Sequence, residues 1–187
     1  MKLELDPVWS VPKHGVLLLD GALCEQGFKE LYSILKDHQL DPLLFQTPYQ
    51  ALVELGPVIV SNQHSQALWS FWQAHWQEAV WLEHAVWLDT SLSIEALREW
   101  LLSRLMIQSE NGLDYWMRWG DSRAINRACL AHCHWPETYW KHIDNIRFLS
   151  KGKTAVWRPV SINAKSGRAD IFESTLFHCL AKSSHSV

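Results

Sequence analysis

The sequence has few of the glycines on which nucleotide-binding and hydrolase motifs depend. Its 187 residues include 8 glycines, and none of them forms a phosphate-binding loop of the nucleotide or dinucleotide type. A Gly-x-Ser-x-Gly turn, which carries the nucleophile of many serine hydrolases, does not occur either. The sequence therefore gives no support to nucleotide-dependent or serine-hydrolase chemistry, and we expect no cofactor.

Basic residues are missing from a long internal stretch, since no Lys or Arg occurs between residues 38 and 97. Residues 1–120 hold 7 basic and 15 acidic side chains, a net charge of −8, whereas residues 121–187 hold 10 and 5, a net charge of +5. The acidic part would repel a phosphate backbone. We therefore expect no nucleic acid among the partners.

Long apolar runs and the features of an export signal are also lacking. The start, Met1-Lys-Leu-Glu-Leu-Asp-Pro7, has acidic residues where a signal peptide has a basic region followed by an apolar one. The run Val16–Leu19 is much shorter than a membrane-spanning segment. These observations predict a cytoplasmic protein without a membrane span, in which the four cysteines are reduced thiols.

Short apolar runs alternate with helical patterns over the first two thirds of the chain. Such alternation favours an α/β fold over a helical bundle. Strands are predicted at residues 16–20, 43–45, 57–60 and 85–89, and helices at about 23–38, 48–55, 65–79 and 93–105. A further helix is predicted from Asp121 or Ser122 to about Cys133.

Asn111-Gly112 is the strongest turn signal in the sequence, because a two-residue hairpin loop needs a positive φ at both positions. It predicts an antiparallel hairpin within an otherwise helix-connected sheet, and thus a mixed β-sheet flanked by helices. Beyond residue 135 the pattern weakens to a short helix and two strands, at 146–150 and 155–160. We therefore predict an α/β domain over residues 1–135 and a C-terminal α+β extension of unassigned role over residues 136–187.

The cluster Cys129-Leu-Ala-His132-Cys133-His134 is the most metal-like feature of the sequence. On a helix Cys129 and Cys133 share a face and would offer two thiolates to one zinc ion. The spacing matches no standard finger, and a second ligand pair at fixed spacing is missing. Packed thiols near a helix end are the favoured interpretation, and we predict no metal site.

Arg118, Asp121 and Arg123 form a polar cluster at the junction of the predicted hairpin and the following helix. A carboxylate between two guanidinium groups has a lowered pKa, which suits a structural ion pair better than a general base. Asp121 is also placed to cap the helix. We predict structural ion pairs here and no catalytic residues.

Tryptophan is over-represented, with 12 residues, five of them between residues 69 and 87. In the helix that begins near Ser65, the apolar side chains form an arc wider than one sheet would cover. Two interpretations remain open: a core face alone, or a core face combined with a partner-binding surface on which Trp acts as an anchor. The absence of basic residues favours the second, with the partner-binding residues Trp69, Phe71, Trp72 and Trp76.

Several motifs follow one another in a fixed order: His14-Gly-Val-Leu-Leu-Leu-Asp-Gly-Ala22, Leu44-Phe-Gln-Thr-Pro48, Leu55-Gly-Pro57 before Val58-Ile-Val60, Val86-Trp-Leu88 with Ser91 and the helix 97–105, and Met117-Arg-Trp-Gly-Asp-Ser-Arg123. This order resembles the effector chaperones, or adaptors, of bacterial type VI secretion, known as domain of unknown function family 4123. The resemblance covers residues 14–135. Ser122 stands where the family usually has Pro, in its Arg-x-x-Asp-Pro-Arg element.

The resemblance implies a non-enzymatic adaptor that binds a secreted effector in the bacterial cytoplasm and helps to place it on the spike protein VgrG, through protein–protein interactions. Two other classes remain open from the residues. One is a small α/β enzyme that uses Asp121 with the histidines, and the other is a zinc-dependent interaction module.

Overall fold

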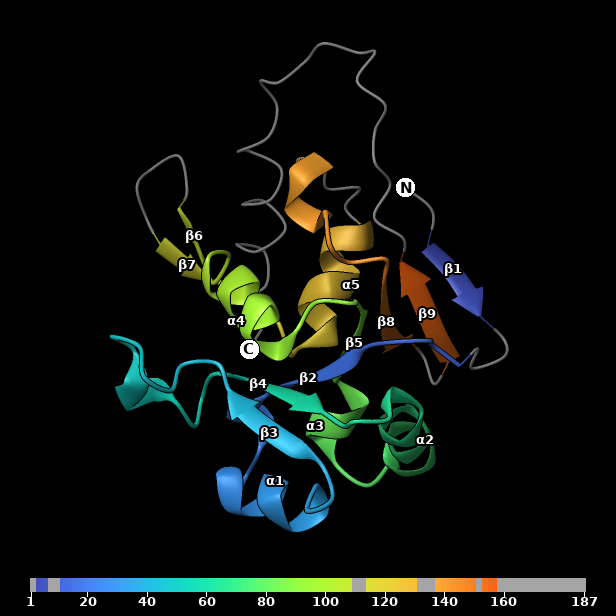
Figure 1. Cartoon of the computed structure of the whole chain (residues 1–187), viewed down its shortest axis with the longest axis horizontal. Coiled ribbons are helices and arrows are strands. Elements are labelled where there is room, and N and C mark those ends of the chain that lie inside the picture. Colours follow the sequence, from blue (N-terminus) through green and yellow to red (C-terminus); the bar gives the residue numbers. More distant parts are fainter. Residues whose placement is uncertain (1–2, 7–10, 109–113, 131–136, 151–152, 158–187) are drawn as a thin grey trace.

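A computed structural model describes residues 3–6, 11–108, 114–130, 137–150 and 153–157 of the chain (Figure 1). The strands are β1 (Leu3–Asp6), β2 (Val16–Asp20), β3 (Gln39–Pro42), β4 (Pro57–Ser61), β5 (Val86–Asp89), β6 (Met106–Gln108), β7 (Asp114–Trp116), β8 (Asn145–Ser150) and β9 (Lys153–Trp157). The helices are α1 (Phe28–Ile34), α2 (Ser65–His75), α3 (Val80–Glu83), α4 (Ile94–Leu102) and α5 (Ser122–Leu130), with 3₁₀ turns η1 (Gly21–Leu23), η2 (Gln50–Leu52) and η3 (Glu137–Trp140).

β2 runs through the sheet with all five of its residues buried. Because successive side chains of a strand point to opposite faces, Leu17 and Leu19 enter one core while Val16 and Leu18 enter the other. Both faces of the sheet must therefore be covered, and Figure 1 shows α1, α2 and α3 on one side and α4 and α5 on the other. The result is three layers with two separate cores.

The main sheet has seven strands in the order β1-β9-β8-β5-β2-β4-β3. This sheet with flanking helices confirms the predicted α/β fold class. Every pairing in the described sheet is antiparallel, however, and the β6–β7 hairpin forms a separate two-stranded sheet. The expected combination of parallel and antiparallel pairings was therefore wrong, because alternation along the chain does not fix the direction in which a strand returns.

The strand predicted at residues 43–45 is a turn, and the edge strand β3 lies just before it. Leu43 and Leu44 belong to that turn and are fully buried, and this burial explains the apolar run. β3 is partly polar and exposed, as edge strands often are, and its composition gave no strand signal. The short helix α3 was not predicted, because four residues are too few to show a helical period.

The segment after residue 135 contributes to the same sheet. β8 pairs with β5, and β9 pairs with both β8 and β1. β8 and β9 are thus continuous with the sheet of the predicted α/β domain. The boundary after residue 135 stays a prediction, since residues 131–136 and 158–187 lie outside the described residues. Among the helices that the structure describes, none has the length and apolar character needed to cross a membrane.

A buried ion pair joins β5 to β8 within this sheet. The Asp89 carboxylate accepts hydrogen bonds from Arg147 Nη2 at 2.8 Å, from Trp87 Nε1 at 2.8 Å and from Asn145 Nδ2 at 2.7 Å. Asp89 and Arg147 are 6% and 8% exposed. A charge buried to this extent is tolerated when it is paired and hydrogen-bonded, so this network connects β8, and through it β9, to the central strands.

Replacing Arg147 by Met should therefore lower the free energy of unfolding by about 3–5 kcal/mol, the usual cost of leaving one partner of a buried pair alone. Urea unfolding at neutral pH measures this loss. Arg127→Met on the exposed side of α5 is the matched control and should change stability by less than about 0.5 kcal/mol. Equal effects of the two substitutions would contradict the structural role of the pair.

Candidate functional site

The tryptophans of α2 do not form an exposed surface. Trp69 and Trp72 are 0% exposed and belong to the core between α2 and the sheet, whereas Phe71 and Trp76 are partly buried at its margin. The prediction of Trp69 and Trp72 as partner-binding anchors was therefore wrong. The outward side of α2 carries exposed, uncharged residues, among them Gln66, Ser70 and Gln73.

Side chains from other elements fill the space that the arc of α2 appeared to leave open. The ring of Trp69 makes edge-to-face contacts with Trp72 and Trp87, at centroid distances of 5.5 and 5.0 Å. The Arg147 guanidinium lies 5.6 Å from the Trp69 ring centroid. Trp72 Nε1 donates a hydrogen bond of 2.9 Å to the carbonyl of Leu82, just before β5. Residues distant in sequence thus cover both rings.

The polar cluster at the start of α5 assembles around two buried carboxylates. Arg123 binds Asp121 with two hydrogen bonds of 2.8 Å, and Arg118 Nη1 lies 3.3 Å from the same carboxylate. Arg118 Nε also donates to Asp20 Oδ2 at 2.6 Å, at the end of β2. The ion pairs predicted for Arg118, Asp121 and Arg123 are present, and Asp20 is the additional member that sequence spacing did not indicate.

Asp121 is also the N-cap of α5, because its carboxylate accepts a hydrogen bond from the Arg123 backbone N–H at 3.0 Å. Burial by itself would raise the pKa of Asp121, but the hydrogen bonds from Arg123 and the charges of Arg123 and Arg118 outweigh it and lower that pKa. The carboxylate is thus held in its ionised form. This environment suits a structural anion and is unfavourable for a general base that must take up a proton near neutral pH.

Gly120 allows this cluster to form against the central strand. A Cβ at position 120 would lie 2.0 Å from the Leu19 carbonyl carbon and 2.4 Å from the Asp20 backbone nitrogen. Only glycine permits so close an approach of the two backbones. The turn before α5 is therefore held directly at the end of β2, where Asp20 and Asp121 share Arg118.

The described residues give little support to a reactive cysteine or to a metal site. Burial, followed by the charges of Glu30 and Asp20, raises the pKa of the Cys24 thiol to about 12, so this thiol is protonated at neutral pH and a poor nucleophile. No group of three or more His, Cys, Asp or Glu in the described part of the chain is arranged to hold a metal ion. Residues 132–134 of the cysteine–histidine cluster lie outside that part.

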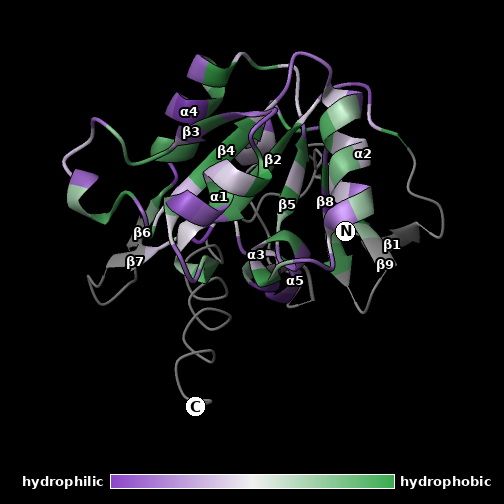
Figure 2. Cartoon of the chain, turned by 90° about the horizontal axis from the view of Figure 1, so that it is seen from below, coloured by the Kyte–Doolittle hydropathy of each residue, from purple (hydrophilic) through white to green (hydrophobic). Residues whose placement is uncertain are grey.

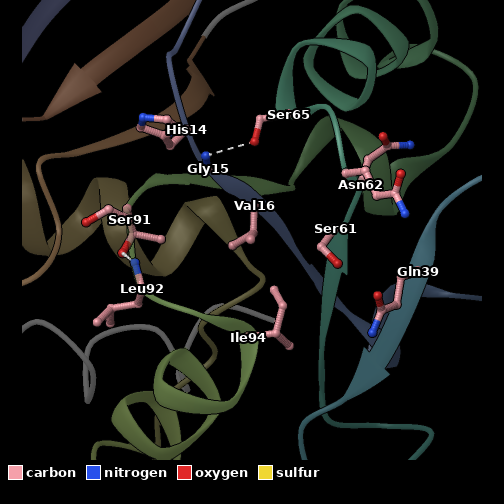
Figure 3. A pocket seen from close by; sticks show the side chains of 12 residues that line it. His14, Gly15, Val16, Gln39, Ser61, Asn62, Ser65, Ser91, Leu92 and Ile94 are labelled. Atoms are coloured by element: carbon pink, nitrogen blue, oxygen red, sulfur yellow. Dashed lines mark hydrogen bonds between the residues drawn. The ribbon is translucent and has the colours of Figure 1, made fainter.

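An open cavity of about 430 Å³ lies where β2 begins and β4 and β5 end (Figure 3). Its wall includes Gln39, Ser61, Asn62 and Ser91, and the Gly15 N–H donates to the Ser65 hydroxyl at 3.3 Å. His14 is the one ionisable side chain among the lining residues. The cavity therefore lacks the paired titratable groups that acid–base chemistry needs.

Large exposed apolar side chains gather in the connection between β3 and β4, residues 43–56. They are Phe45, Tyr49, Leu52 and Leu55, with exposed fractions of 48, 42, 45 and 60%. Figure 2 shows this connection projecting at one side of the molecule, close to β6 and β7. Sequence reasoning assigned these residues to a strand and a short helix and missed their exposure. A connection of fourteen residues, which is long for a compact domain, was the available signal.

Comparison with known proteins adds one finding to this geometry. The model of a family described as Domain of unknown function (DUF4123) matches residues 17–138, about two thirds of the chain. The match spans β2 to the start of η3 and so includes both the β3–β4 connection and the cluster at Asp121. Comparisons with curated proteins and with solved structures gave no match.

Because Trp69 is a core residue, Trp69→Ala should lower the free energy of unfolding by about 3–5 kcal/mol, the cost of deleting a large buried aromatic side chain. Chemical denaturation followed by circular dichroism measures the change. Trp76→Ala, at the margin of the same helix, is the control and should cost less. A Trp69→Ala variant as stable as the wild type would show that this side chain is not in the core.

Asp121→Asn should destabilise the fold near neutral pH by about 1–3 kcal/mol, since charge-assisted hydrogen bonds are lost. A lowered carboxyl pKa in the folded state contributes stability above the pKa of the unfolded chain, about 3.9, and that contribution is lost as the pH falls through the folded-state pKa. The difference between variant and wild type should therefore shrink in acid. Urea titrations at neutral and acidic pH test this, and a pH-independent difference would contradict it.

Proposed function

Because the chain belongs to the DUF4123 family, the effector-adaptor family of type VI secretion that its motif order resembles, we propose that it is a non-enzymatic bacterial adaptor. In this proposal the protein acts in the cytoplasm, binds a secreted effector and helps to load it onto the VgrG spike protein. Its partners are the effector and the spike, and it needs neither a cofactor nor nucleic acid.

The observation that carries this proposal is the exposed apolar surface of the β3–β4 connection. Soluble proteins rarely leave large apolar side chains grouped on one segment unless a partner covers them. Two of the family-like motifs, Leu44–Pro48 and Leu55–Pro57, fall in or beside this connection. An adaptor needs a protein-binding surface, and this connection offers one.

The residues around Asp121 have a supporting role in the proposal. Their ion pairs hold the turn before α5 against the end of β2. The side chains of Arg118 and Arg123 are 41% and 44% exposed. Both guanidinium groups already bind buried carboxylates, so we assign them to the fold rather than to a partner. A contribution of Phe71 and Trp76 to partner binding stays a prediction.

The adaptor function predicts that this protein and the effector encoded beside it co-purify when they are co-expressed. It also predicts that deletion of the gene keeps that effector from reaching VgrG, measured as the amount of effector that precipitates with the spike. A secreted effector encoded elsewhere in the same genome serves as the control, and its association with the spike should not change. Failure to co-purify, with normal loading in the deletion strain, would refute the proposal.

A further inference from the structure

We propose that Tyr49, Leu52 and Leu55, here called the apolar ridge, form the surface on which the effector docks, and that the docked segment is apolar with flanking Lys or Arg side chains. This inference rests on the adaptor function proposed above and specifies its binding surface. It moves the predicted interaction from α2 to the connection between β3 and β4.

The spacing of the ridge residues places them on one line. The Leu52 N–H donates to the Tyr49 carbonyl at 2.8 Å, and the Leu55 N–H donates to the Leu52 carbonyl at 2.9 Å. These bonds between residues three apart are of the 3₁₀ type, in which residues three apart lie directly above one another. The three side chains therefore present a continuous apolar edge to solvent.

The segment that carries the ridge is held in place from both ends. The Leu43 N–H donates to the Pro57 carbonyl, and the Gly21 N–H donates to the Gly56 carbonyl, each at 2.9 Å. Leu43 and Leu44 are fully buried, and Val53 packs against the core from between the ridge residues. The ridge is thus ordered before any partner arrives, which reduces the entropy that binding must overcome.

One backbone conformation in the same segment is unusual. Gln46 has a φ of 58°, the single positive φ of a non-glycine residue in the described part of the chain. A residue with a side chain is disfavoured in this region. Unfavourable backbone conformations of this kind occur often at binding sites, and Gln46 lies just before the ridge. Its conformation is therefore consistent with a binding role of the connection.

The ridge continues onto the β6–β7 hairpin. Tyr49 packs edge-to-face on Trp116, with 5.3 Å between the ring centroids. Trp116 pairs across the hairpin with Met106, which is 37% exposed, so the two side chains lie on the same face of the two-stranded sheet. Aromatic residues and Met are enriched in the centres of protein interfaces, and here they extend the ridge sideways.

The charges around the ridge select the type of partner. Glu54, which is exposed, is the one charged side chain in residues 43–56. Arg98 on α4, whose guanidinium donates to the carbonyls of Pro42 and Phe45 at the start of the connection, is paired with Asp41 at 2.9 Å. The surface therefore offers the negative charge of Glu54 beside apolar side chains, which complements an apolar segment with Lys or Arg on its flanks.

The test measures the dissociation constant between the purified protein and the effector encoded beside it. Leu55→Gln and, independently, Leu52→Gln should each weaken binding by at least about tenfold, as expected for interface anchors. Val80→Gln on α3 is the matched control, because Val80 is 54% exposed against 60% for Leu55 but lies away from the ridge. It should leave the dissociation constant within about twofold. Thermal unfolding of each variant checks the fold, and all three should match the wild type because the replaced side chains are exposed.

The charge of the partner has a separate test at Glu54. Glu54→Lys should weaken effector binding more than Glu54→Gln does, and the gap should narrow at high salt, since screening reduces the repulsion between the introduced lysine and a basic segment. Equal binding by the two Glu54 variants would overturn the basic character of the docked segment.

Other results separate failure of the ridge from failure of the adaptor function. If wild type and both Leu variants bind the effector equally well, the ridge is not the docking surface, although the protein remains an effector adaptor. If the wild type does not bind the effector at all, both proposals fail. If Leu55→Gln reduces only VgrG binding or only self-association, the occupant is the spike or a second copy, and the effector assignment is overturned.

Discussion

The fold depends on a central strand, β2, that is buried on both faces. All of its residues are buried, and its alternate apolar side chains enter two different cores. Such a strand is stable only when helices cover both sides of the sheet, so the positions of α1 to α5 follow from this requirement. The high tryptophan content has the same cause, because Trp69, Trp72, Trp81 and Trp87 fill one core while Trp100, Trp119 and Trp140 fill the other.

The ends of β2 also determine where the surface features of the protein lie. At its C-terminal end, Asp20 shares Arg118 with Asp121, and Gly120 brings the start of α5 against the strand. Gly21, which follows the strand directly, binds the end of the β3–β4 connection through the Gly56 carbonyl. Two of the segments that carry family-like motifs, the β3–β4 connection and the turn before α5, are therefore positioned by the same end of β2.

Sequence patterns predicted many of the strands and helices, but they did not predict which side chains are exposed for binding. The runs at residues 16–20, 57–60 and 85–89 were long enough in apolar residues to indicate β2, β4 and β5, and Ser93 marked the start of α4 through its hydrogen bond to the Ala96 N–H. The ion pairs of Asp121 followed from charges close together in sequence. The exposed apolar residues of the β3–β4 connection were missed, because an apolar residue contributes equally to a sequence pattern whether its side chain is buried in the core or exposed to solvent.

The sequence by itself determined the fold class, the succession of strands and helices, the local ion pairs and, through the order of its motifs, the family. These properties depend on residues that are near one another in the chain. Only the tertiary structure decided the antiparallel sheet order and the burial of Trp69, because these depend on groups far apart in sequence. Arg147, supplied by β8, lies over the Trp69 ring and pairs with Asp89 on β5, and no local pattern in α2 contains that contact.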